Sequence, residues 1–93
     1  MIEVVDRPSA SRYEALLDGT VVGECTYRIT DHGVLLPHIE VRPDLNGQGI
    51  GSTLARRTLD DLRRRHLTVI PICPFMVHFI RVNPEYADLV HAG

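Results

Sequence analysis

Hydrophobic and polar residues alternate along the first 42 residues in the pattern of β-strands. The alternation predicts four strands, at Ile2–Val5, Arg12–Leu17, Val21–Ile29 and Val34–Arg42. Turn sequences separate the later strands, with Asp18-Gly19 before the third and Asp31-His32-Gly33 before the fourth. Short turns between neighbouring strands indicate an antiparallel β-meander.

After Pro43 the apolar residues follow a helical period. A helix is predicted from about Ile50 to His66, with one apolar stripe formed by Ile50, Leu54, Ala55, Leu59 and Leu62. The run Leu67–Cys73 is almost entirely apolar, which predicts a strand covered on both faces. A strand, a helix and a strand in this order favour a right-handed βαβ unit, in which the later strand is parallel to its partner.

The last part of the chain predicts a second helix that begins at Pro74, followed by a final turn or short helix. Asn83-Pro84-Glu85 has the pattern of an N-cap with Pro at the first helical position. The predicted fold class is therefore α+β (α/β): an antiparallel meander followed by a βαβ unit, with a mixed central sheet and two main helices in a small three-layer-like domain.

Length and composition limit the possible classes of protein. A chain of 93 residues predicts one domain, spanning residues 1–93, and 44% hydrophobic with 24% charged residues is typical of a globular protein. The net charge of -2 gives no general attraction to nucleic acid. The run Arg63-Arg64-Arg65 is explained by cations in a last helical turn, which offset the helix dipole. We expect a monomer.

The composition also bears on location and metals. The longest uncharged stretch, Leu67–Ile80, is too short to span a bilayer and contains two prolines, so no membrane association is predicted. Charged residues near the N-terminus argue against a signal peptide. Cys25 and Cys73 are too few for a disulfide framework and show no metal-ligand spacing. These features predict a reduced, cytoplasmic protein without a metal site.

A glycine-rich segment, Asn46-Gly47-Gln48-Gly49-Ile50-Gly51, lies between the fourth predicted strand and the first helix. Glycines at such a place let backbone N–H groups approach an anion in front of the positive end of the helix dipole. A P-loop is excluded because the chain has no Lys, and a Rossmann fingerprint fails because position 52 is Ser. A single pyrophosphate cradle remains, with a turn that binds nothing as the alternative.

The stretch from Val41 to Gly51 resembles motif A of the GNAT superfamily of acyl-CoA-dependent N-acetyltransferases. In that motif Arg or Gln is followed by two residues, Gly, any residue and Gly or Ala. Gly49 and Gly51 match the two glycines, while Asn46 replaces the usual Arg or Gln. A wider similarity, to the short single-domain YjdJ-like acetyltransferases, extends over nearly the whole chain and rests on His38–Val41, Cys73-Pro74-Phe75 and Asn83-Pro84-Glu85-Tyr86.

The resemblance implies a GNAT-like fold and an acetyl-CoA-dependent N-acetyltransferase that acts on a primary amine, either a small amine or a protein amine. It implies that the amides of Gly47–Ser52 hold the coenzyme A pyrophosphate and that the backbone of Ile39 and Val41 pairs with the pantetheine. The implied cofactor-binding residues are Ile39, Val41, Asn46, Gly47, Gln48, Gly49, Ile50, Gly51, Ser52, Cys73 and Phe75.

Three residues are candidates for catalysis. Cys73 directly precedes a predicted helix, whose N-terminus favours the thiolate, so Cys73 could accept the acetyl group, protonate the leaving thiolate or line the pocket. A buried structural thiol is the alternative. His38 and Glu40 share one face of a strand and could relay a proton from the amine, or could be ordinary solvent-facing residues.

Two features leave the function open. The Tyr that often protonates the leaving thiolate in the similar family is replaced by Phe79, and Tyr86 is expected to pack the C-terminus. The alternative functions are therefore a coenzyme A or acyl-CoA binding module with little or no catalysis, and a partner-binding protein. The short chain has no room for elements that wall the acceptor site, so we expect an open acceptor groove.

Overall fold

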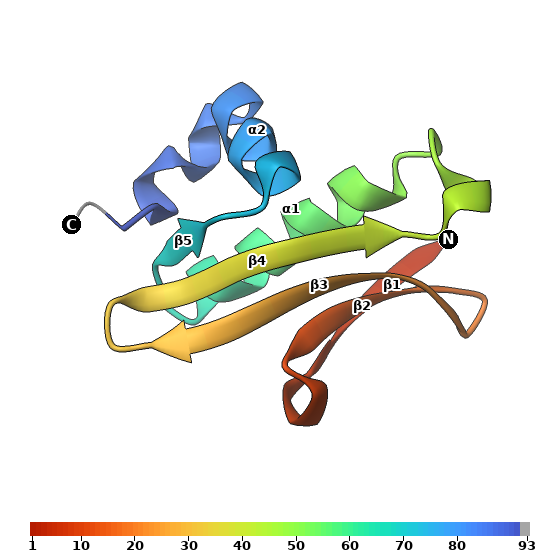
Figure 1. Ribbon diagram of the computed structural model, residues 1–93, viewed down its shortest axis with the longest axis horizontal. Helices are drawn as coiled ribbons and strands as arrows, with labels where there is room; N and C mark the ends of the chain where they lie inside the picture. Colours follow the sequence, from red (N-terminus) through yellow and green to blue (C-terminus); the bar gives the residue numbers. More distant parts are fainter. Residues whose placement is uncertain (92–93) are drawn as a thin grey trace.

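One five-stranded sheet, in the order β1-β2-β3-β4-β5, forms the framework of this computed structural model, which describes residues 1–91 (Figure 1). The strands are β1 (Ile2–Arg7), β2 (Arg12–Leu17), β3 (Thr20–Thr30), β4 (Gly33–Val41) and β5 (Val69–Pro71). The helices are α1 (Ile50–Arg64) and α2 (Pro74–Val82), followed by the 3-10 helix η3 (Pro84–Leu89). The mixed sheet and the two main helices confirm the predicted fold class.

The first four strands form the predicted antiparallel meander. Each of them pairs with the next along the chain. Asp18 and Gly19 have φ angles of 51° and 84°, the left-handed conformation that tight hairpin turns require. β1 is longer than expected, because its pairing with β2 continues to Arg7 opposite Arg12. Only a short 3-10 turn, Pro8–Ala10, joins these two strands.

β5 is parallel to β4, as the βαβ pattern predicted, but it is much shorter than Leu67–Cys73. Its pairing ends at Leu36 opposite Pro71. The amides of Ile72 and Cys73 then both donate to the carbonyl of Leu36, each at 3.2 Å. The parallel hydrogen bonding between β4 and β5 therefore ends at the carbonyl of Leu36. In Figure 1 the chain then turns away from β4 into α2.

The expectation that this apolar run is covered on both faces is wrong, because Thr68 and Ile72, on one of its faces, are exposed. Val69 is buried, but the Ile72 side chain is 54% exposed. The physical reason is that the helices do not sandwich the run. α2 packs beside α1 and contributes Met76, Phe79 and Ile80 to the same hydrophobic core.

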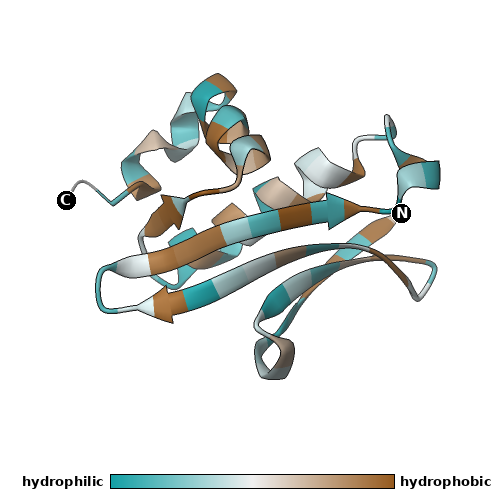
Figure 2. Cartoon of the chain, in the orientation of Figure 1, coloured by the Kyte–Doolittle hydropathy of each residue, from teal (hydrophilic) through white to brown (hydrophobic). Residues whose placement is uncertain are grey.

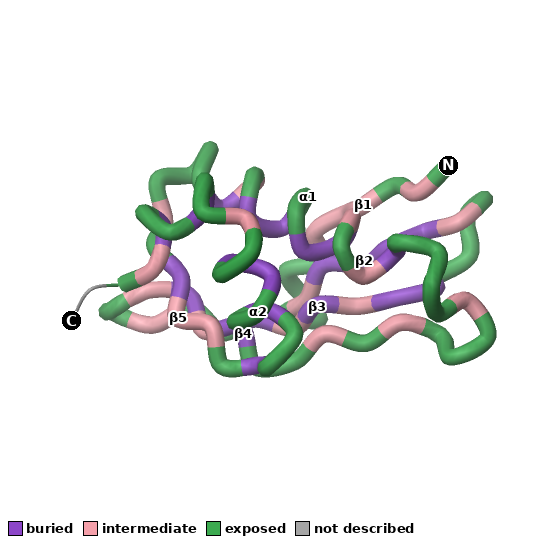
Figure 3. The backbone as a smooth tube through the Cα atoms, turned by 90° about the horizontal axis from the view of Figure 1, so that it is seen from above, coloured by how far each residue is buried: buried purple, intermediate pink, exposed green. Residues whose placement is uncertain are grey.

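The core lies between α1 and one face of the sheet. The apolar stripe of α1 is buried as predicted, and the helix buries Ile50, Leu54, Ala55, Thr58, Leu59 and Leu62. The sheet supplies buried residues such as Ala15, Val22 and Leu36. Figure 3 shows buried stretches along α1 and along the strands. Figure 2 shows that β4 is hydrophobic beside β5 and alternates in hydropathy toward its end. Thus β4 changes from a core strand to a surface strand along its length.

The C-terminal segment is held against α1 by side chains. Asn83 was predicted to cap η3, but its side chain makes no capping hydrogen bond there. Instead, Asn83 Nδ2 donates to the carbonyl of Phe79 at the end of α2. Arg63 binds Asp88 through both of its terminal nitrogens, each at 2.9 Å. Tyr86 is buried and packs this segment, as expected. No helix in residues 1–91 is both long enough and apolar enough to cross a membrane.

Glu14 makes the stability of the fold depend on pH. Hydrogen bonds from Arg12 and then Arg7 hold its pKa below the ordinary value of 4.5. A carboxyl group with a lowered pKa stabilises the fold above its unfolded pKa, and this contribution is lost as the pH falls through the folded pKa. Glu14→Gln should therefore flatten the fall in the free energy of unfolding below about pH 4.5, measured by urea denaturation at several pH values.

Arg12→Gln provides a second test of this coupling. Because it removes the larger cause of the lowered pKa of Glu14, it should flatten the same part of the curve. If the free energy of unfolding of both variants falls in acid as steeply as that of the wild type, the Glu14 carboxylate does not contribute to the pH dependence of stability.

Candidate functional site

A pocket of about 370 Å³ lies where β4 continues beyond β5 and α1 begins. One wall is the end of β4, the second is the loop into α1, and the third is the ring of Phe75 from α2. Its lining residues are Ile39, Glu40, Val41, Leu45, Asn46, Gly47, Gly49, Ile50, Gly51, Ser52 and Phe75. We call this the β4–α1 pocket.

The end of β4 presents a free backbone edge to the pocket. The amide of Arg42 donates to Val22 on β3. Since successive residues of a strand direct their N–H and C=O groups to opposite edges, Ile39 and Val41 direct theirs away from β3. β5 has already ended by this point. An extended chain could therefore hydrogen-bond to Ile39 and Val41 as an additional strand.

The N-terminus of α1 presents free amides to the same pocket. Thr53 donates to Gly49 at 3.0 Å, the first hydrogen bond within the helix, so the amides of Gly49, Ile50, Gly51 and Ser52 precede the helical ladder. No side chain of the described chain caps this helix. Uncapped amides with the helix dipole behind them form a site for an anion.

The glycines of the loop serve two different structural needs. Gly47 and Gly49 have φ angles of 86° and 79°, and a Cβ on either would meet nothing within 4 Å. They are required for backbone conformation, and they leave the space above the loop open. A Cβ on Gly51, in contrast, would lie 3.1 Å from Cζ of Phe75. Gly51 therefore allows the ring of Phe75 to close against the first turn of α1.

His38 and Glu40 lie together on the sheet face opposite α1, as the strand pattern predicted. His38 Nε2 is 3.4 Å from Glu40 Oε1. Their side chains are 54% and 68% exposed. Glu40 lines the β4–α1 pocket, whereas His38 does not. Glu40 is thus a residue of the pocket wall, and its carboxylate, with His38 beside it, is open to solvent.

Cys73 occupies the junction between β5 and α2. It is buried and is the N-cap residue of α2, and its amide is bound to Leu36 where the two strands separate. It is not among the residues that line the β4–α1 pocket. Cys25 also lies in the core, where burial raises the pKa of its thiol to about 12. Cys25 is therefore protonated at neutral pH.

Among the residues that the structure describes, no phenol near the pocket is free to act as a proton donor. Phe79, at the position where a Tyr is common in similar proteins, is buried. Tyr86 donates to Asp60 at 2.7 Å, and burial together with this hydrogen bond raises its pKa. The Tyr86 hydroxyl therefore binds the C-terminal segment to α1.

The structure brings together nearly all of the residues that the sequence suggested for cofactor binding; Gln48 and Cys73 do not line the pocket. Sequence analysis missed Leu45, which completes the apolar part of the lining. It also missed Arg56, which lines a second groove beside the pocket. The sequence did contain a signal for Arg56: it lies one helical turn after Ser52, and therefore on the same side of the helix as Ser52. Among residues 1–91, no group of three or more His, Cys, Asp or Glu side chains could hold a metal ion.

This combination of a mixed sheet, an early end to the parallel ladder and an uncapped helix defines a class of acyltransferase fold. A family model described as GCN5-related N-acetyl-transferase matches residues 12–89. The chain belongs to this family of N-acetyltransferases, and the protein is an acyltransferase. No curated protein matches its sequence.

Solved structures agree in fold. A GCN5-like protein from Staphylococcus aureus, solved by NMR, has a TM-score of 0.72 and 23% identity, with 95% of this chain and 86% of that chain covered. A ribosomal-protein-alanine N-acetyltransferase from Brucella melitensis has a TM-score of 0.61 and 20% identity, with 88% and 62% covered. These similarities support the family's fold and leave the YjdJ-like branch a prediction.

The two roles of the glycines can be separated by a double-mutant cycle. Gly51→Ala should be less favourable for stability in the wild type than in a Phe75→Leu background, because its Cβ would lie 3.1 Å from Cζ of Phe75. Gly49→Ala should cost about 1–2 kcal/mol in both backgrounds, because its strain is in the backbone. The measurement is the free energy of unfolding in urea. Equal losses for Gly51→Ala in both backgrounds would contradict the assigned contact.

Proposed function

We propose that this protein is an acetyl-CoA-dependent N-acetyltransferase that acts on a primary amine, either a small amine or an amine of a protein. The observation that carries the proposal is the β4–α1 pocket, in which a free strand edge and uncapped helical amides line one cavity. Coenzyme A has the matching sequence of parts, an extended amide-containing arm followed by a pyrophosphate. Family membership supports the same assignment.

The residues of the pocket fit this ligand. The N–H and C=O groups of Ile39 and Val41 would bind the amides of the arm, as one β-strand binds another. The amides of Gly49, Ile50, Gly51 and Ser52 would bind the pyrophosphate. Asn46 supplies no positive charge, so the helix dipole and these amides would provide the attraction. Open space above Gly47 and Gly49 allows the close approach that such binding needs.

The carboxylate of Glu40 is the best-placed group to take the proton from an attacking amine. Acetyl-CoA supplies a thioester whose carbonyl carbon the amine attacks. Glu40 lines the pocket and is exposed, so an amine can reach it from solvent. His38 beside it can pass the proton on to water. We expect the acceptor groove on this face of the sheet to be open, because only a short 3-10 turn joins β1 to β2.

Cys73 would act on the thioester sulfur or on the acetyl group of acetyl-CoA. At the N-terminus of α2 its thiol could protonate the leaving thiolate, or its thiolate could accept the acetyl group and then transfer it to the amine. Intact mass measurement after incubation with acetyl-CoA separates these roles. A mass gain of one acetyl group that disappears in Cys73→Ser indicates the covalent route.

A coenzyme A binding module with little catalysis is the second candidate function. The observation that favours it is the absence of a free phenol near the pocket in the described chain, since Phe79 is buried and Tyr86 is bound to Asp60. This candidate predicts binding of acetyl-CoA without acetyl transfer to any amine in a broad panel.

A pair of variants at Gly47 tests the binding proposal through charge alone. Gly47 lines the pocket, and Asn and Asp both tolerate a positive φ better than other residues. Gly47→Asp should weaken acetyl-CoA binding at least about tenfold relative to Gly47→Asn, because it places a carboxylate beside the pyrophosphate. Isothermal titration calorimetry measures both. Equal affinities would mean that no phosphate binds at this loop.

A variant at Glu40 tests the proposed general base. Glu40→Gln keeps the shape of the side chain but cannot accept a proton, so kcat should fall by about 10²-fold or more. The KM for acetyl-CoA should change little, because the coenzyme is bound mainly by backbone groups. Transfer is measured by release of free thiol over a panel of amines. An unchanged kcat and pH profile would exclude Glu40 as the base.

A further inference from the structure

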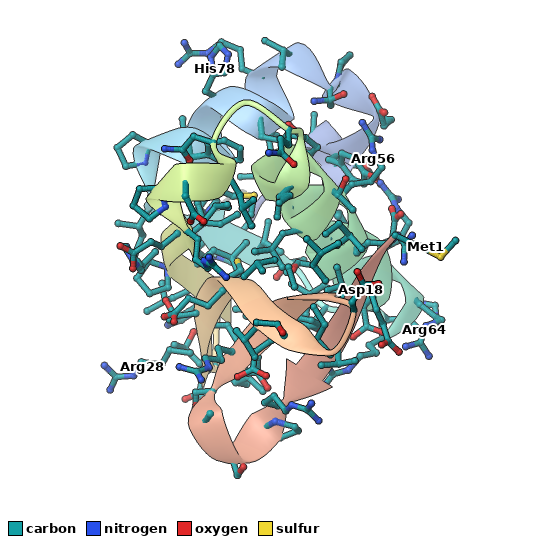
Figure 4. All side chains as sticks on the ribbon, turned by 90° about the vertical axis from the view of Figure 1, so that its right-hand side faces the viewer. Met1, Asp18, Arg28, Arg56, Arg64 and His78 are labelled. Atoms are coloured by element: carbon teal, nitrogen blue, oxygen red, sulfur yellow. The ribbon has the colours of Figure 1, made fainter. Side chains whose placement is uncertain are left out.

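A second groove, of about 320 Å³, lies between α1 and α2 beside the β4–α1 pocket. Its lining residues are Ser52, Arg56, Phe75, His78, Phe79, Val82 and Asn83. Ser52 and Phe75 line both the groove and the pocket, so the two are continuous. In Figure 4, Arg56 and His78 lie on the side of the molecule formed by these helices. We call this the α1–α2 groove.

Aromatic and apolar side chains form much of the α1–α2 groove. The rings of Phe75 and Phe79 are nearly parallel, with centroids 6.5 Å apart and an interplanar angle of 11°. Phe75 is 41% exposed and Val82 is 57% exposed, although both are apolar. An exposed ring and an exposed aliphatic side chain in one groove are suited to a planar, weakly polar group such as a purine base.

Arg56 gives the groove a positioned positive charge. Its Nη2 donates to Asn83 Oδ1 at 3.2 Å, and its guanidinium carbon lies 5.4 Å from the centroid of the Phe79 ring. The nearest carboxylate is Glu85, at 3.4 Å, and it is 56% exposed. An exposed pair at this distance contributes little, so Glu85 can turn away when a stronger anion arrives. A guanidinium fixed in this way is suited to a phosphate.

The spacing along α1 links this charge to the loop amides. Arg56 follows Ser52 by four residues, which places the two on one side of the helix about 6 Å apart along its axis. A ligand whose diphosphate binds at the amides before Thr53 therefore has its next group at the groove. That group would meet aromatic rings and a guanidinium.

We propose that the α1–α2 groove binds the 3′-phosphoadenosine end of coenzyme A, with Arg56 contacting the 3′-phosphate and Phe75 contacting the base. The inference rests on the proposed function, because it needs the pyrophosphate to bind at the N-terminus of α1. It adds a specificity: the protein distinguishes coenzyme A from its 3′-dephospho form. Arg56 is then a specificity-determining residue rather than a surface charge.

The test compares the dissociation constants of coenzyme A and 3′-dephospho-coenzyme A by calorimetry. The wild type should bind coenzyme A about tenfold more tightly, because one charge-assisted contact is lost with the 3′-phosphate. Arg56→Gln should bind the two ligands equally while keeping the wild-type affinity for the dephospho form. Glu85→Gln should widen the difference, because it removes the acid that competes for Arg56.

Arg63→Gln is the matched control. Arg63 lies on the same helix, also contacts the C-terminal segment and also lies over the ring of Tyr86, but it does not line the groove. It should lose a similar set of structural contacts and keep the discrimination. Comparing the two ligands on the wild type needs no variant to fold, so the test does not depend on the stability of Arg56→Gln.

The outcomes separate this inference from the proposed function. Equal affinity of the wild type for the two ligands overturns the inference and leaves acetyl-CoA binding intact. Loss of discrimination in Arg63→Gln as well as in Arg56→Gln also overturns it, because the effect would then come from the C-terminal segment. No binding of either ligand overturns both proposals.

Discussion

The early end of the β4–β5 ladder is the constraint on which the rest of the site depends. Parallel pairing covers only Leu36 and the two residues before it, and the Leu36 carbonyl then accepts the amides of both Ile72 and Cys73. No residue of β4 after Leu36 pairs with β5. The rest of β4 is therefore left with an unpaired edge, which forms one wall of the β4–α1 pocket. The same turn of the chain directs α2 back over the first turn of α1.

The pocket is closed on its remaining side by packing between the two helices. Phe75 can lie against α1 only because Gly51 has no side chain, while Gly47 and Gly49 shape the loop without contacting anything above it. Arg56 and Arg63 then hold the C-terminal segment to α1 through Asn83 and Asp88. The proposed coenzyme site is thus supported by the whole second half of the chain, although most of its contacts would come from backbone groups.

Much of this arrangement could be predicted from local sequence. Period-2 and period-3.6 patterns located the meander and α1, and the glycines located the loop, because these features are encoded by neighbouring residues. The length of β5 could not be predicted, since an apolar run does not reveal where its partner strand stops pairing. The groove at Arg56 was missed for a similar reason: a cation off the apolar stripe looks solvated until α2 is placed beside it. The predictions of a cytoplasmic location, a monomer and a single domain rest on length and composition, and they remain predictions.

The central claim is that one cavity binds coenzyme A through the strand edge and the helix amides together. The most direct measurement is an NMR titration of the ¹⁵N-labelled protein with acetyl-CoA, which follows each backbone amide. We expect large shifts at Ile39, Val41 and residues 49–52, with smaller changes at Cys73. Shifts confined to the loop would contradict the role of the β4 edge. No shift at millimolar ligand would mean that the glycine loop is only a turn, and that the pocket does not bind coenzyme A.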